Sequence, residues 1–109
     1  MADSTKVLGQ LAAAATTTET LYTVPNLAQT TCSSLTVCNR TAGALTFRVS
    51  VHVAGAGADN KQYLFYDAPL DANATLGMVV GLTLNQADVV KTYASAGGLT
   101  FQLFGVETT

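Results

Sequence analysis

Hydrophobic and polar residues alternate most regularly in Ala44–Val53, whose sequence is ALTFRVSVHV. Every second residue from Leu45 to Val53 is apolar, and the residues between them are polar. A period of two is typical of a strand with one face in a core and one in water, whereas a helix would scatter these residues around its surface. The pattern therefore predicts a strand that places Ser50 and His52 on the solvent face.

Similar short runs follow one another along the rest of the chain. Turn signals recur about every 8–12 residues, which is typical of an antiparallel sandwich or small barrel. We therefore predict an all-β fold, an antiparallel β-sandwich of jelly-roll-like type with seven to eight strands. The other expected strands are Glu19–Val24, Gln29–Cys38, Lys61–Tyr66, Thr75–Leu82, Val89–Ala94 and Leu99–Val106.

The loops between these strands suggest how they connect. Residues 39–43, NRTAG, are interpreted as a hairpin loop that pairs Gln29–Cys38 with Ala44–Val53. Pro69 favours a turn over Asp67–Asn73, after the aromatic strand.

Two further patterns concern strand faces. In Thr75–Leu82 the large apolar residues are in phase, and the glycines at 77 and 81 share the opposite face, where they permit close approach of another backbone. The apolar phase of the last strand shifts near Leu103–Gly105, which predicts a bulge.

The chain of 109 residues has the length of one domain. Residues 1–18 are of low complexity, with an AAAATTT run that lacks large side chains, so we expect an extended arm that a partner orders. Lys6–Gln10 could form a short strand within it. The predicted division is an arm over residues 1–18 and one β-sandwich domain over residues 19–109.

Charged residues make up only 11% of the chain, against about 25% in ordinary soluble domains. Charge is depleted at the centres of protein interfaces, so this composition favours a surface that neighbours cover in an assembly. A small secreted domain with a neutral surface is the alternative interpretation.

The formal net charge is −2, and the five Lys and Arg residues form no basic stripe, so we expect no nucleic-acid partner. No apolar run approaches the roughly 18 residues of a membrane helix. The first residues contain Asp3 before Lys6 and few large apolar side chains, so we expect no signal peptide.

Cys32 and Cys38 lie six residues apart in one expected strand. A straight strand would place both on the same face, about 20 Å apart, which is too far for a disulfide. Two free thiols are the preferred interpretation, and a bridge to a neighbouring subunit is the alternative.

The candidate chemistry is sparse. Asp67 and Asp71 form the one close carboxylate pair, but their order does not match a calcium loop, and turn formation explains them better. The single histidine, His52, is interpreted as an exposed side chain, with a polar cluster or a pH response at an interface as alternatives. We expect no catalytic, cofactor-binding or metal-ligating residue. Tyr63 and Tyr66 could stack sugars with the loop Ala54–Asn60, although tyrosines serve packing more often.

Several stretches together resemble a family of small virion proteins from tailed bacteriophages. The resemblance covers most of the chain after residue 5 and consists of strand sequences without a catalytic signature. The stretches are LYTVP (21–25), TVCNRTAGALTFRVSV (36–51), KQYLFYDAPL (61–70), ADVVKTYAS (87–95) and LTFQLFGVE (99–107).

This resemblance implies a β-sandwich accessory protein of the head, neck or tail, and it transfers no active-site residues. We therefore expect no enzymatic activity and, from the charge and hydropathy above, no membrane or nucleic-acid partner. We expect a homo-oligomer, with a trimer as the first guess by analogy, that binds capsid, neck or tail proteins in a virion assembled in the bacterial cytoplasm. The competing hypotheses are a carbohydrate- or receptor-binding module and a secreted bacterial adhesin domain.

Overall fold

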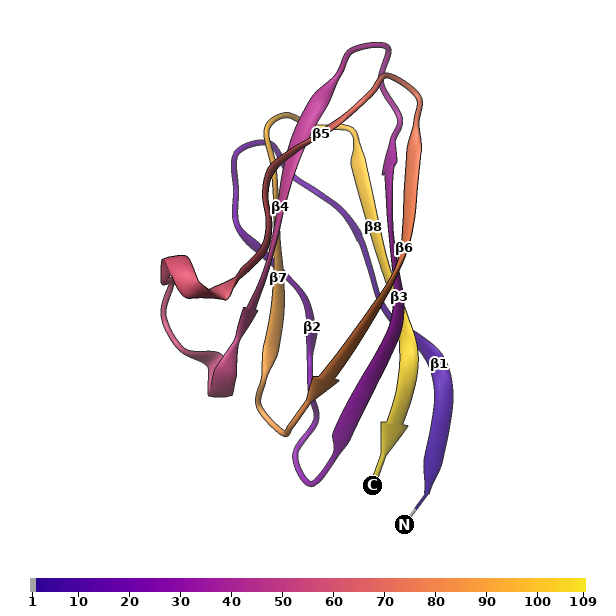
Figure 1. Ribbon diagram of the computed structural model, residues 1–109, viewed down its shortest axis with the longest axis vertical. Helices are drawn as coiled ribbons and strands as arrows, with labels where there is room; N and C mark the ends of the chain where they lie inside the picture. The colour runs from indigo at the N-terminus through magenta and orange to yellow at the C-terminus, as the bar shows by residue number, and fades with distance from the viewer. Residues whose placement is uncertain (1) are drawn as a thin grey trace.

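Eight strands form two four-stranded antiparallel sheets in the computed structural model, which describes residues 2–109 (Figure 1). Two short 3-10 helices, η1 (Val53–Gly55) and η2 (Asn60–Gln62), lie in the connection between the fourth and fifth strands. The strands are β1 (Asp3–Ala12), β2 (Glu19–Thr23), β3 (Gln29–Asn39), β4 (Leu45–His52), β5 (Tyr63–Leu70), β6 (Thr75–Leu84), β7 (Val89–Ala94) and β8 (Leu99–Thr108).

One sheet has the strand order β1-β8-β3-β6 and the other has the order β2-β7-β4-β5. Consecutive strands lie in different sheets, except β4 and β5, which pair with each other. This interleaving of two sheets is the topology of a jelly roll. The predicted all-β sandwich is therefore confirmed, with eight strands.

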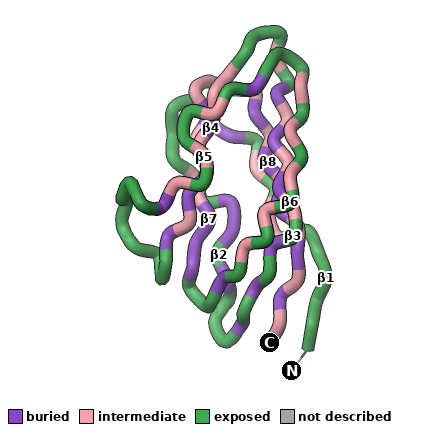
Figure 2. Tube along the Cα trace, in the orientation of Figure 1, coloured by how far each residue is buried: buried purple, intermediate pink, exposed green. Residues whose placement is uncertain are grey.

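The core lies between the sheets, where the inward side chains of both meet. Phe47 of β4 packs edge-on against Phe101 of β8, with ring centroids 6.1 Å apart, and lies 5.7 Å from Phe65 of β5. Figure 2 shows buried residues alternating with exposed or partly exposed ones along β3, and with partly exposed ones along β8, as expected where one face of a strand lies in the core.

The predicted hairpin between Gln29–Cys38 and Ala44–Val53 is wrong. The corresponding strands β3 and β4 lie in different sheets, and β3 pairs with β6 and β8. Both strands bury one apolar face, so they face each other across the core, and residues 40–44 cross from one sheet to the other. Period-two alternation identifies a strand, but it does not choose the neighbour.

Residues 3–12 differ from the expected arm, because they form the edge strand β1. This strand pairs with β8 from Asp3 opposite Thr108 to Ala12 opposite Thr100. Its side chains are mostly exposed, which explains why the sequence lacks a strong apolar signal (Figure 2). The backbones of Ala2 and Thr109 also exchange two hydrogen bonds of 2.9 Å, so the two ends of the chain lie side by side.

The bulge predicted in β8 lies in its neighbours instead. Burial alternates without interruption along β8, so this strand contains no extra residue. The register shifts between Leu103 and Phe104 on the β1 side, where Leu8 is the additional residue, and between Phe104 and Gly105 on the β3 side, where Ser33 is. A Cβ at position 105 would collide with the backbone of β3, so glycine is required there for close packing of the strands.

The prediction that Cys32 and Cys38 share one face is wrong, because the bulge at Ser33 lies between them. This bulge reverses the faces of β3, so Cys32 is buried in the core whereas Cys38, on the other face, is partly exposed. Both thiols are free, and burial raises the pKa of Cys32 to about 11.

Strand β5 continues to Leu70, beyond its predicted end at Tyr66. Asp67 has a φ of 50°, and the register with β4 shifts near it. Pro69 is compatible with this strand because β5 lies at the edge of its sheet, where one side of the backbone needs no donor.

Candidate binding surface

An arginine held between two tyrosines dominates the outer face of the sheet β2-β7-β4-β5. Arg48 of β4 lies opposite Tyr93 of β7, so these two side chains share the outer face. The guanidinium carbon lies 4.5 Å from the centre of the Tyr93 ring and 4.2 Å from that of Tyr66. Both distances lie within the range of about 6 Å over which a ring face attracts a cation.

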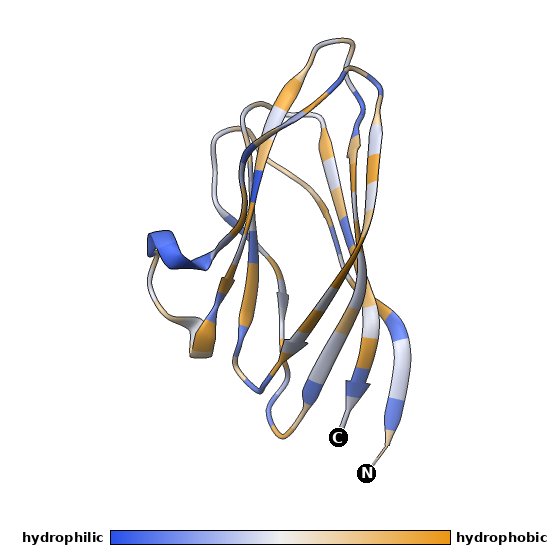
Figure 3. Cartoon of the chain, viewed as in Figure 1, coloured by the Kyte–Doolittle hydropathy of each residue, from blue (hydrophilic) through white to orange (hydrophobic). Residues whose placement is uncertain are grey.

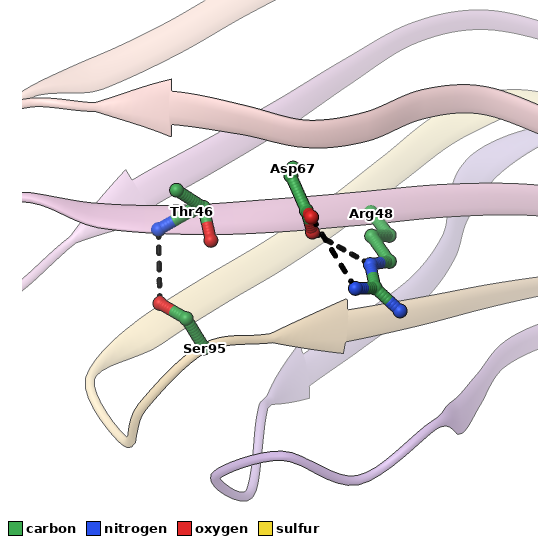
Figure 4. A network of polar contacts seen from close by, with 4 residues as sticks. All are labelled: Thr46, Arg48, Asp67 and Ser95. Atoms are coloured by element: carbon green, nitrogen blue, oxygen red, sulfur yellow. Dashed lines mark hydrogen bonds and ion pairs between the residues drawn. The ribbon is translucent and has the colours of Figure 1, made fainter.

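Asp67 fixes the same arginine from the neighbouring strand β5. Arg48 Nε donates to Asp67 Oδ1 at 2.7 Å and Nη2 donates to Oδ2 at 3.3 Å, a two-point contact shown in Figure 4. This hydrogen bond is the main reason that the pKa of Arg48 is raised. Figure 4 also shows Ser95 accepting from the backbone N–H of Thr46, which ties β4 to the end of β7.

Tyr63 extends this aromatic surface toward η2. Its ring lies edge-to-face with Tyr66, at a centroid distance of 4.8 Å and an angle of 80°. Asn60, Tyr63 and Tyr66 line an open hollow of about 340 Å³. We call Arg48, Asn60, Tyr63, Tyr66 and Asp67 the tyrosine platform; it presents aromatic surface beside amide and carboxylate groups and offers packing and hydrogen bonds to a ligand.

Ser50 and His52 are buried, so the prediction that they are exposed to solvent is wrong. The loop between β4 and β5 folds back over them. His52 Nδ1 lies 2.8 Å from the carbonyl oxygen of Ala56, which can only accept, so Nδ1 carries the proton. In the neutral ring, Nε2 then accepts from the Ser50 hydroxyl at 2.8 Å.

The loop that covers His52 is fixed by its own hydrogen bonds. The Asp59 side chain accepts from the Lys61 backbone, and Gln62 both accepts from the Asp59 N–H and donates to the Gly57 carbonyl. The glycine-rich sequence therefore closes over one end of β4. Alternation in β4 alone carries no information about this cover.

The expected carboxylate pair is divided between two roles. Asp67 pairs with Arg48, while Asp71 lies in the turn between β5 and β6, where its carbonyl accepts from Ala74. Within residues 2–109, no group of three or more His, Cys, Asp or Glu side chains could hold a metal ion. In the same part of the chain, no helix is long and apolar enough to cross a membrane.

A second polar cluster, which the sequence did not indicate, connects the two sheets at the end near the termini. Tyr22 of β2 donates to Glu107 of β8 and lies 2.8 Å from the Thr30 hydroxyl of β3. Lys6 Nζ of β1 reaches the other Glu107 oxygen at 2.6 Å. The pKa of Glu107 is lowered, first by Lys6 and then by Tyr22, and burial followed by Glu107 raises the pKa of Tyr22.

This cluster predicts how stability depends on pH. A carboxyl whose pKa is lower in the folded state adds stability above its unfolded pKa, near 4.5, and loses it as the pH falls through the folded value. We expect Glu107→Gln to reduce the free energy of unfolding by about 1.5–3 kcal/mol at pH 7. Urea unfolding at pH 7, 5 and 3 should show that the difference from wild type shrinks at low pH; a constant difference would contradict this role of the carboxylate.

An apolar groove lies between the edge strands β5 and β6. It has a volume of about 260 Å³, and its lining is almost entirely aliphatic or aromatic. Leu76, Met78, Val80 and Leu82 point toward the core, while Val79 is 89% exposed. The prediction that the apolar residues of this strand share one face is confirmed. The lining residues are Leu64, Phe65, Met78, Val79, Val80 and Leu82.

No protein-family model matches the chain, and a search of curated proteins finds no match.

Proposed function

We propose that this chain is a structural protein of a tailed-bacteriophage virion, placed as a head-decoration, neck or fibre-base, or tail-accessory subunit. It acts by protein–protein assembly and has no catalytic role. Its partners are copies of itself, with a trimer as the initial guess, and the capsid, neck or tail proteins. The particle is assembled in the cytoplasm of the bacterial host.

The observation that carries this proposal is a surface with few charges and many exposed apolar side chains. Charged residues make up only 11% of the chain, and charge is depleted at the centres of protein interfaces. The exposed apolar side chains lie on several elements, so more than one side of the sandwich is suited to contacts. The exposed large apolar residues are Val7, Leu27, Val53, Leu64, Tyr66 and Val79.

Quantitative mass spectrometry of particles tests the proposal. Particles are purified by density gradient from a lysate of the source culture, and peptides of this chain are counted against the major capsid protein. We expect several copies per particle that remain after a high-salt wash, because apolar contacts are not screened by salt. Recovery of the chain only in the soluble fraction would contradict a virion role.

A carbohydrate-binding module is the second candidate, and the hollow at Asn60, Tyr63 and Tyr66 favours it. Aromatic rings beside amide and carboxylate groups suit a neutral sugar. An acidic sugar is less suited, because Asp67 already pairs with Arg48.

Substitution of Tyr66 tests this second candidate. On a glycan array, Tyr66→Ala should abolish any sugar signal, since it removes the exposed ring, whereas Tyr66→Phe should retain most of it. A signal equal in Tyr66→Ala and wild type would exclude the platform as the sugar site, and wild type without a signal would exclude this candidate.

A further inference from the structure

The two sheets leave four strand edges, and three of them carry features that block pairing with another chain. Edge strands are commonly protected by charges, proline, bulges or short length. Strand β1 contains Asp3 and Lys6 and a register shift, and β2 has only five residues. Strand β5 contains Asp67 and Pro69 and is also irregular in register.

The fourth edge, β6, lacks most of this protection. Its ten residues, TLGMVVGLTL, include no charged residue and no proline. Figure 3 shows no strongly hydrophilic segment along it. Its pairing with β3 is uninterrupted from Thr75 to Val79, and the register shifts only between Val79 and Leu82. The far side of β6 has no neighbour within its sheet, so backbone donors and acceptors remain unpaired there.

The two sides of the sandwich also differ in closure. On the side of β1 and β2, Gly9 lies directly against the carbonyl of Leu21, and a Cβ would not fit. On the side of β5 and β6, the apolar groove remains open between the sheets. A strand added to β6 would satisfy the free backbone groups and cover part of this groove at the same time.

We propose that the occupant is β6 of a second copy, paired antiparallel across a two-fold axis with Met78 opposite Met78. In this register the protruding Val79 of each copy lies beside Gly77 of the other, which has no side chain to obstruct it. Leu76 lies beside Val80, so apolar side chains meet on the core face. No like charges meet along the strand, although each copy has a net charge of −2.

The resulting dimer joins two four-stranded sheets into one of eight strands. Its two-fold contact is isologous, so the same residues serve both copies. This contact joins copies in pairs, so a trimer would need a different contact elsewhere on the surface. It does not depend on the virion proposal, because the contact forms between copies of the purified chain.

Sedimentation equilibrium of the full chain from 1 to 500 µM tests the dimer. We expect wild type to approach twice the chain mass at high concentration. Val79→Lys should weaken dimerisation at least tenfold, because it places a charge on each side of the paired edges. Thr83→Lys is the matched control, since Thr83 is an exposed residue of the same strand beyond the register shift, and it should dimerise as wild type does.

A crosslink tests the register. In a Cys38→Ser background, Met78→Cys should form a covalent dimer under mild oxidation, whereas Thr83→Cys should remain monomeric. A chain that stays monomeric at 500 µM, or equal weakening by Val79→Lys and Thr83→Lys, would overturn the proposal. Circular dichroism of each variant establishes that it is folded. Failure here would leave the mass-spectrometric test of the virion role unaffected.

Discussion

Replacing Phe101 by alanine should lower the free energy of unfolding by about 3–5 kcal/mol. Phe101 is fully buried near the start of β8 and packs edge-on against Phe47 of the opposite sheet. Its removal leaves a cavity that spans the interface of the two sheets, and the strands around it are paired on both sides and cannot collapse into it. Urea denaturation followed by circular dichroism measures the effect.

Phe104→Ala is the matched control for this prediction. Phe104 lies three residues further along the same strand, but on its outer, partly exposed face. We expect its replacement to cost less than half as much as that of Phe101. Because small domains are stable by only about 5–15 kcal/mol, Phe101→Ala is expected to unfold at much lower urea, or not to fold. Similar losses for the two variants would show that the core is not centred on Phe101.

Asn39→Ala should be the most damaging polar substitution, with a loss of about 3 kcal/mol. Asn39 ends β3, is only 1% exposed, and connects three segments. Its Nδ2 donates to the carbonyls of Gly43, Leu70 and Asp71 at 2.9–3.2 Å. Its Oδ1 accepts from the Thr41 backbone and hydroxyl. Alanine would leave the buried Leu70 carbonyl without this donor and would remove four further, partly buried hydrogen bonds at once.

Asn73→Gly serves as the comparison. Both asparagines begin an Asn-x-Thr sequence, but Asn73 is exposed in a turn and has a φ of 55°, which glycine also adopts. Thermal unfolding should show a fall of several degrees for Asn39→Ala and little change for Asn73→Gly. Equal melting temperatures for wild type and Asn39→Ala would contradict its role as a connector of the sheets.

The sequence predicts the strands of this fold better than their neighbours. Val89–Ala94 agrees with β7 at both ends, and the other predicted strands overlap the observed ones, since alternation is a local property of the chain. The pairing of β3 with β8 depends on how two sheets close around one core, which no short stretch encodes. For the edge strand β1 the sequence indicates only a possible short strand over Lys6–Gln10, because its side chains are mostly exposed and its order comes from backbone pairing with β8.

For the candidate surface, too, the sequence indicates individual residues better than which of them lie together. The tyrosines at 63 and 66 are recognisable as sugar-stacking candidates, and the structure places them together beside Asn60. Arg48 joins them because β4 and β7 pair in a register that sets it opposite Tyr93. The burial of His52 follows from a loop that folds back over it. Both outcomes depend on distant segments, so residue type alone does not reveal them.

The adjacency of Ala2 and Thr109 bears on how the molecule can be extended. Residues attached to either end would leave from the same pole of the sandwich, as Figure 1 makes clear, while the loop at residues 40–44 lies at the opposite pole. A peptide or fluorescent label fused to either end of the chain would project away from both the tyrosine platform and Thr75–Val79. Joining the two ends by a short linker should also allow new termini to be opened in an exposed loop without loss of the sheets.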